Sequence, residues 1–84
     1  RAVDDIANRR YIDGIHAALR VRNPNLGDDE ARAAAVVLMR STIAVLDAAF
    51  EADDTTARRL VDNLLAMHQA LLARLLESKV STRR

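Results

Sequence analysis

The sequence predicts an all-α protein, an antiparallel helical bundle of three main helices. The chain has 84 residues with only one proline and two glycines, so few residues interrupt a helix. Its β-branched residues do not alternate with polar residues at period two, which is the pattern of a half-buried strand. Apolar residues instead recur three and four positions apart along three long segments, as they do on one side of an α-helix.

The first predicted helix covers residues 3–22 and has one apolar side. At about 100° per residue, apolar and charged side chains separate onto different sides. The apolar side consists of Ala7, Tyr11, Ile15, Ala18 and Leu19, and the charged side of Arg9, Asp13, His16 and Arg20. We expect the apolar side, including the Tyr11 ring, to be buried in the bundle.

The segment NPNLGDDE ends the first helix and starts the second. Pro24 disfavours a helical conformation at Asn23, the residue before it. Gly27 is a suitable N-cap, and the acidic residues 28–30 that follow suit the positive end of a helix dipole. The second helix is therefore predicted over residues 28–52.

The second predicted helix is apolar around most of its circumference. Its charged residues form one narrow ridge, and a heptad-spaced apolar stripe lies beside it. The ridge holds Arg40, Asp47 and Glu51, and the stripe holds Val36, Ile43 and Phe50. An ordinary surface helix buries an apolar arc of about 100°, and this arc is roughly twice as wide. We expect the helix to be covered on two sides.

The third predicted helix covers residues 54–78 and starts from a cap at Asp53 or Asp54. Its apolar stripe spans about half the circumference, which is also wide for a peripheral helix. The stripe consists of Leu60, Val61, Leu64, Leu65, Met67, Leu71, Leu72, Leu75 and Leu76. Residues 79–84 have no apolar period and are expected to form a disordered tail.

The surplus apolar surface of the last two helices predicts a homodimer. Two neighbours cannot cover such wide arcs, and a large exposed apolar patch usually marks a partner. The simplest partner is a second copy, with these helices forming a four-helix seam across a two-fold axis. The predicted interface residues are Val36, Arg40, Ile43, Asp47, Phe50, Leu65, His68, Leu72 and Leu76. The alternative is that the remainder of a longer chain covers the surplus.

Arg40 raises a separate question, because no acidic residue lies three or four positions away. Asp47 lies seven positions on, about 10 Å along the axis, too far for an easy pair within one helix. If the second helix crosses its symmetry mate antiparallel near Ile43, Arg40 approaches Asp47 of the partner subunit. This cross-dimer ion pair is a hypothesis that needs a second chain.

Composition restricts the other partners. Thirteen basic and twelve acidic residues give a net charge of +1, which does not favour general attraction to nucleic acid or anionic membranes. The chain has no cysteine, which excludes cysteine-based zinc and redox sites and favours a reducing, cytoplasmic setting. A membrane span needs about 20 mostly apolar residues, and Arg40 and Asp47 interrupt the apolar segment. We therefore expect no membrane contact.

No catalytic or metal-binding motif is present, and we expect neither enzymatic activity nor a cofactor. His16 and His68 fall on different helices with no acid or cysteine at ligand spacing. No glycine-rich loop is present to hold a phosphate. Ser41 has no histidine at helical distance and is interpreted as a small packing residue.

A small apolar ligand is the other predicted partner. His68 lies at the centre of the third helix's apolar arc, as a hydrogen-bonded neutral ring or as a polar anchor for a ligand. Apolar walls with a few polar groups are typical of ligand pockets. The predicted ligand-binding residues are Tyr11, Ile15, Met39, Thr42 and His68. Ordinary core packing is the alternative for each of them.

Two segments, NPNLGDDEARAAAVVLMRSTIAVLDAAF and RRLVDNLLAMHQALLARLL, resemble the C-terminal half of a TetR-family transcriptional regulator. An Asn-Pro-x-Leu turn, an acidic helix start, an Ala-rich helix and a final Leu-rich helix come in that family's order. The resemblance covers residues 11–78. It implies an all-α dimer whose C-terminal domain binds a small, often hydrophobic effector and whose last two long helices form the dimer seam.

The resemblance also implies a bacterial repressor in which an N-terminal helix-turn-helix, absent from this chain, binds DNA. The chain begins with Arg1 and is expected to be a fragment of that longer protein. Its arginine- and alanine-rich composition points to GC-rich coding and an actinobacterial source. Two alternatives remain open: a purely structural dimerisation module, and a small all-α dimeric enzyme resembling chorismate mutase. Gln69 and Arg74 lie on the polar side of the third helix, which disfavours the enzyme.

Overall fold

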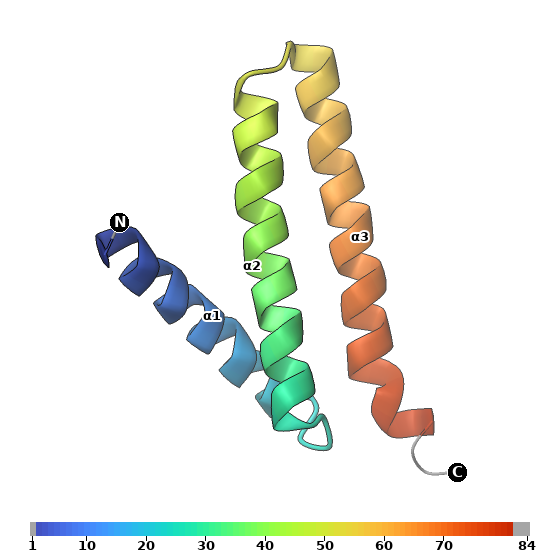
Figure 1. Cartoon of the computed structure of the whole chain (residues 1–84). Coiled ribbons are helices and arrows are strands. Elements are labelled where there is room, and N and C mark those ends of the chain that lie inside the picture. Colours follow the sequence, from blue (N-terminus) through green and yellow to red (C-terminus); the bar gives the residue numbers. More distant parts are fainter. Residues whose placement is uncertain (1, 82–84) are drawn as a thin grey trace.

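The computed structural model describes the backbone of residues 2–81 and the side chains of residues 7–77. The described chain forms three helices, α1 (Ala2–Arg22), α2 (Asp28–Phe50) and α3 (Asp54–Ser81), with no strand among these residues. Figure 1 shows the helices in chain order. The predicted all-α fold with three main helices is confirmed.

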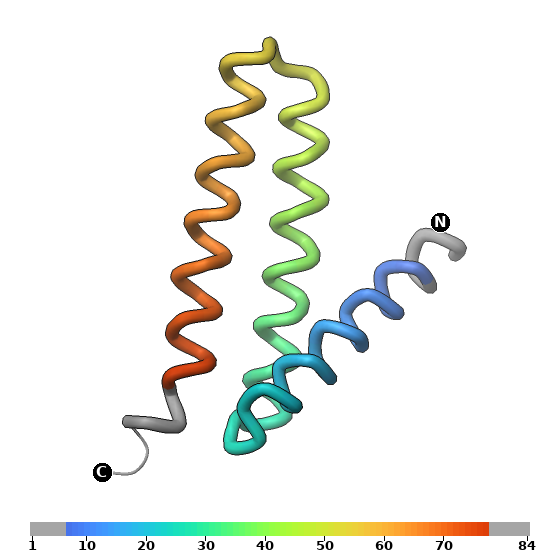
Figure 2. The backbone as a smooth tube through the Cα atoms, turned by 180° about the vertical axis from the view of Figure 1, so that it is seen from behind, coloured from blue at the N-terminus to red at the C-terminus, as the bar shows by residue number. Residues whose placement is uncertain are grey.

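The helices form a thin layer. α2 and α3 lie side by side because the chain turns back at residues 51–53, whereas α1 diverges from α2 at an angle (Figure 1). Seen from behind, α1 passes the end of α2 close to the α1–α2 connection (Figure 2). α2 packs against both other helices, and the molecule measures 47 × 32 × 14 Å. Away from the crossing of α1 and α2 (Figure 2), large apolar side chains of the hairpin stay exposed, such as Leu46, Leu65 and Met67.

The hydrophobic core joins all three helices at the end where α1 meets α2. Its buried members are small or leucine side chains, surrounded by partly buried aliphatic side chains. The buried members are Leu19, Leu26, Ala31, Ala34 and Leu75, and the surrounding ones are Ile15, Leu71, Leu72 and Leu76. Farther along the α2–α3 hairpin, packing is thinner, although Leu64 is still buried there.

Asn23 is a buried polar residue in the α1–α2 connection, with an exposed fraction of 0%. Its side-chain amide donates from Nδ2 to the carbonyl of Leu75 in α3, at 2.8 Å. Its Oδ1 accepts a hydrogen bond from the backbone N–H of Asn25 at 3.2 Å, and its carbonyl accepts one from Leu26 at 3.0 Å. Asn23 therefore fixes the turn around Pro24 and ties that turn to α3.

The start of α2 holds α1 through charged contacts. Gly27 is the N-cap with φ −62° and ψ 149°, as predicted, and an acidic turn follows it. Asp28 Oδ1 lies 2.8 Å from His16 Nε2 and accepts a hydrogen bond from Arg20 at 2.9 Å. Asp28 is exposed and Arg20 is half-buried, so these solvent-accessible contacts contribute little stability but orient α1 on α2.

Local hydrogen bonds set the other helix ends. α2 ends at Phe50, slightly before the predicted end at residue 52, because the N–H groups of Glu51 and Ala52 bond in tight turns to Ala48 and Ala49. α3 continues to Ser81, past the predicted end near residue 78, since neither glycine nor proline interrupts it there. Residues 82–84 of the predicted tail lie outside the described residues.

Asp53 caps α3 and makes the stability of the hairpin depend on pH. Its Oδ1 accepts the backbone N–H of Thr56 at 2.7 Å. This bond, followed by one from the Thr56 side chain, lowers the pKa of Asp53 below its ordinary value. A lowered pKa in the folded state gives a stabilising contribution that is present above the unfolded pKa and is lost as pH falls through the folded pKa.

We therefore expect Asp53→Ala to lower the melting temperature at neutral pH and to lose this effect in acid. Thermal unfolding of both proteins, followed by circular dichroism between neutral pH and strong acid, measures the difference. A difference in melting temperature that stays constant into acid would show that the Asp53 carboxylate is not the stabilising cap.

α2 is long and apolar enough, by length and composition alone, to cross a membrane, and 17% of its apolar window is buried. A single helix of this kind is a weak indication, because the core helix of a soluble protein has the same length and composition. It does not make the chain a membrane protein.

Candidate ligand-binding cavity

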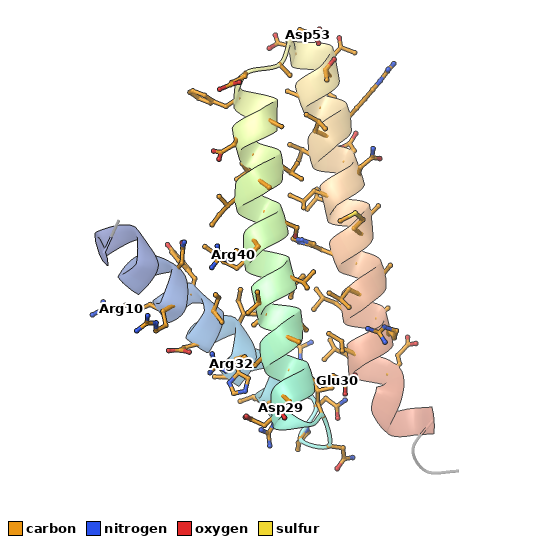
Figure 3. The ribbon with its side chains drawn as sticks, in the orientation of Figure 1. Arg10, Asp29, Glu30, Arg32, Arg40 and Asp53 are labelled. Carbon is orange, nitrogen blue, oxygen red and sulfur yellow. The ribbon has the colours of Figure 1, made fainter. Side chains whose placement is uncertain are left out.

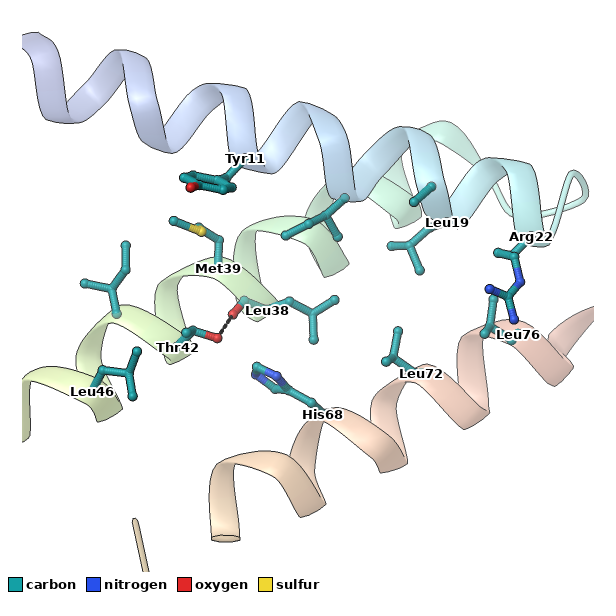
Figure 4. A pocket seen from close by; sticks show the side chains of 13 residues that line it. Tyr11, Leu19, Arg22, Leu38, Met39, Thr42, Leu46, His68, Leu72 and Leu76 are labelled. Atoms are coloured by element: carbon teal, nitrogen blue, oxygen red, sulfur yellow. Dashed lines mark hydrogen bonds between the residues drawn. The ribbon is translucent and has the colours of Figure 1, made fainter. Parts of the chain in front are cut away.

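An open cavity of about 850 Å³ lies between the three helices (Figure 4). Its volume falls in the range of small-molecule sites, about 300–1,000 Å³. α1 contributes Tyr11, Ile15, Ala18, Leu19 and Arg22; α2 contributes Leu38, Met39, Thr42, Ile43 and Leu46; α3 contributes His68, Leu72 and Leu76. The walls are therefore mainly aliphatic, with a few polar groups.

The divergence of α1 from α2 creates this space. The two helices pack closely near their connection, and α1 then leads away from the α2–α3 hairpin (Figure 1). The lining residues of α2 recur three and four positions apart, so they share one side of that helix. The side of α2 on which these residues recur therefore forms one wall of the cavity.

All five predicted ligand-binding residues line this one cavity. They come from all three helices: Tyr11 and Ile15 from α1, Met39 and Thr42 from α2, and His68 from α3. The structure therefore brings together side chains that the sequence places as far apart as positions 11 and 68.

The expected burial of Tyr11 is wrong, because 64% of its surface is exposed. α1 packs on α2 through Ile12 and Leu19, which are buried, and not through the side centred on Tyr11. Tyr11 is rotated by about 100° from Ile12 and lies at the open rim of the cavity. The ring is a wall of an open site and not part of the core.

A hydrogen bond between α2 and α3 orients His68. Ser41 Oγ lies 2.6 Å from the carbonyl of Val37 and 2.8 Å from His68 Nε2. A carbonyl can only accept, so the single hydroxyl hydrogen of Ser41 points to Val37. The proton of the bond between Ser41 and His68 then belongs to Nε2, and His68 donates to Ser41. If Ser41 instead donated its hydrogen to His68, Ser41 Oγ and the carbonyl oxygen of Val37 would lie 2.6 Å apart with no hydrogen between them.

The sequence does not predict this bond, because its local pattern identifies Ser41 only as a small packing residue. The two residues are 27 positions apart, on different helices, and no spacing rule within one helix connects them. The pair does not resemble an activated serine. In a serine nucleophile the histidine accepts the hydroxyl proton, whereas here it donates.

Metal-ion binding finds no support in the described part of the chain. Among residues 7–77 no group of three or more His, Cys, Asp or Glu side chains converges. Within the cavity lining, Arg22 is the one charged side chain and no carboxylate is present. Figure 4 shows Arg22 beside Leu76, at the end of the cavity away from Thr42. The site thus suits an apolar molecule and not a cation.

The structure divides the predicted dimer-interface residues between two sides of α1. Ile43, His68, Leu72 and Leu76 line the cavity. Val36 and Arg40 line a separate, smaller groove with Asn8, Arg9, Ile12 and Arg32. Among the remaining predicted interface residues, Asp47 is exposed, and Phe50 and Leu65 expose 92% and 52% of their surface. All of these apolar side chains remain available to a partner.

Arg40 is exposed and lies near two other arginines. Figure 3 shows Arg40 and Arg32 projecting from α2 on the side of α1, and Arg9 lines the same groove. Arg32 pairs with Asp13 at 3.1 Å. Within the described side chains neither Arg40 nor Asp47 forms an ion pair. The cross-dimer pair between them stays a prediction.

Comparison with known protein families supplies an identification. The model of the family described as "Tetracyclin repressor-like, C-terminal domain" matches residues 1–77. No curated protein and no solved structure matches the chain. The family match covers all the residues that form the cavity, and it agrees with the resemblance found in the sequence. The chain therefore belongs to the family of tetracyclin repressor-like C-terminal domains of TetR-family regulators.

Proposed function

We propose that the chain is the effector-sensing and dimerising region of a TetR-like bacterial transcriptional repressor that acts in the cytoplasm. C-terminal domains of this family generally dimerise and bind effectors. In this proposal an N-terminal helix-turn-helix outside these residues binds DNA. The effector is a small, mainly apolar molecule held between α1 and the α2–α3 hairpin.

One observation carries the proposal: side chains from three helices meet around a single apolar cavity with a few polar groups. Tyr11, Thr42 and His68 supply the polar groups, each on a different helix. A cavity with apolar walls and a small number of convergent polar groups is the usual form of a small-molecule site.

The geometry also suggests how a ligand acts. α1 diverges from α2 (Figure 1), so a molecule that fills the wedge between them favours one angle of α1 over others. α1 leads back toward the proposed DNA-binding segment. If the two states of α1 differ in affinity for both the effector and DNA, each ligand changes the affinity of the other by the same factor.

Binding can be tested with anilinonaphthalene sulfonate, a dye whose fluorescence rises in apolar sites. We expect a saturable rise in fluorescence and a higher melting temperature of the chain with the dye, since a ligand that binds only the folded state stabilises it. A linear, non-saturating rise with no change in melting temperature would count against a formed site.

For the dimer, we propose that the cavity side of the α2–α3 hairpin forms the seam, so that the partner subunit closes the open side of the cavity over the effector. Leu65 lies seven and eleven positions before Leu72 and Leu76, so the three residues share one side of α3. Met67 is about 200° around the helix from Leu65, on the opposite side. Leu65 and Met67 are equally exposed, at 52% and 54%, and so form a matched pair.

We expect Leu65→Glu to weaken the dimer at least about tenfold, because the two-fold axis buries an unpaired carboxylate from each subunit. Met67→Glu should leave the dimer intact. Size exclusion with light scattering measures the mass against the 9.3 kDa of one chain. The reverse pattern, with Met67→Glu giving the monomer, would place the seam on the other face.

A further inference from the structure

We infer that the cavity selects apolar ligands that donate a hydrogen bond, such as phenols and alcohols, over ligands whose oxygen can only accept one. The inference rests on the proposed ligand-binding function and names the chemistry of the ligand. Two polar side chains, Thr42 from α2 and His68 from α3, face each other across the cavity (Figure 4). The inference follows because each already donates its hydrogen to another group of the protein.

His68 has one ring nitrogen occupied as a donor. Its Nε2–H is directed to Ser41 Oγ, because the Ser41 hydrogen bonds to the Val37 carbonyl. In the neutral ring the other nitrogen, Nδ1, then carries a lone pair and can only accept. Among the described residues the hydrogen bond of His68 is made by Nε2, which leaves Nδ1 available. His68 therefore offers the cavity an acceptor.

Thr42 has used its hydrogen in the same way. Its Oγ1 donates to the carbonyl of Leu38, one turn earlier in α2, at 2.7 Å (Figure 4). The remaining capacity of this hydroxyl is as an acceptor. Two acceptors on opposite walls thus face the same part of the cavity, and neither can serve a ligand that brings only another acceptor.

The other polar groups leave this preference in place. Arg22, which can only donate, lies at the far end of the cavity beside Leu76, away from Thr42 and His68 (Figure 4). The Tyr11 hydroxyl can donate or accept and does not discriminate between the two kinds of ligand. A ligand hydroxyl between α2 and α3 can donate its hydrogen to His68 Nδ1 or Thr42 Oγ1. An ether oxygen in the same place has no hydrogen to donate, so the lone pairs of these acceptors stay unpaired, which is costly.

The test compares para-butylphenol with para-butylanisole, which differ only in the methyl group on the oxygen. Titration of the intact chain, followed by calorimetry, should give about three- to ten-fold tighter binding of the phenol, the range expected for one net hydrogen bond. The hydrophobic effect alone would favour the anisole, which has one more methyl group to bury. Equal or tighter binding of the anisole overturns the inference while the ligand-binding function stands.

Two variants identify the acceptors. Ser41→Ala removes the partner that fixes the His68 proton without changing a cavity-lining residue, and Thr42→Val removes the second acceptor. In each, the ratio of phenol to anisole affinity should fall toward one, while Thr55→Val, an exposed threonine far from the cavity, should keep the ratio. Circular dichroism checks that all three remain helical.

If the phenol preference persists in both Ser41→Ala and Thr42→Val, the preference has another origin and the assignment to His68 and Thr42 is wrong. If neither compound binds the unaltered chain, the proposed ligand-binding function fails, and this inference fails with it. The three results are distinguishable because each affinity is measured separately.

Discussion

Replacing Asn23 with Asp is expected to destabilise the folded chain by about 3 kcal/mol, although the two side chains have the same shape. The Asn23 amide is fully buried and donates to the Leu75 carbonyl at 2.8 Å. A carboxylate cannot donate, so the substitution places two acceptors against each other and buries a charge. The connection between α1 and α2 would then lose its link to α3.

This loss is large for a chain of 84 residues, whose total stability is of the order of 4 to 13 kcal/mol. Urea denaturation of the original chain and the variant measures the difference. Asn25→Asp is the matched control, because Asn25 lies in the same connection with an exposed side chain and should change stability by less than about 0.5 kcal/mol. Similar losses in both variants would mean that the buried bond is not the cause.

Ala18→Trp is expected to weaken binding of anilinonaphthalene sulfonate at least about tenfold, since an indole would occupy much of the space that the dye needs. Ala18 lines the cavity from α1 and is itself exposed, so the larger side chain extends into open space and not into the core. The helix should therefore form normally in the variant.

Ala17→Trp provides the control for this experiment. Ala17 is the preceding residue, is also exposed, and does not line the cavity. It is rotated by about 100° from Ala18, so the same tryptophan is placed outside the site. Affinity measured by fluorescence should be lost in the first variant and kept in the second. Equal affinities in the two variants would show that the dye binds elsewhere.

The helices and their caps could be predicted because local chemistry decides them. Gly27 and Asp53 start their helices in the structure as the sequence indicates, the first through its backbone conformation and the second by accepting the N–H of Thr56. The predicted break before Pro24 is also present. These features depend on residues a few positions apart, within the range of one helical turn.

Features that depend on how helices cross could not be predicted in the same way. Periodicity places Tyr11 on the apolar side of α1 but does not fix which part of that side meets α2, and the actual contact uses Ile12 and Leu19. The bond between Ser41 and His68 needs the register of α2 against α3. Asn23 is a polar residue, so apolar periodicity does not predict its burial. It is buried because the connection between α1 and α2 packs against α3.

The predicted dimer interface depends both on spacing within one helix and on how the helices cross. Heptad spacing groups Val36, Ile43 and Phe50 on one stripe of α2, which is a property of that helix alone. The placement of α1 then separates Val36 from Ile43, with each lining a different groove. Which of these surfaces meets a second subunit depends on contacts outside a single chain.

The claim that one cavity between three helices binds a small apolar molecule is tested most directly by an NMR titration of the isotope-labelled chain with para-butylphenol. The predicted result is saturable shift changes of backbone amides in all three helices, at Ala18, Thr42 and Leu72, with no change near Arg58 and Asp62 at the start of α3. Changes confined to Val37 and Met67, which do not line the cavity, or the absence of saturable changes, would contradict it.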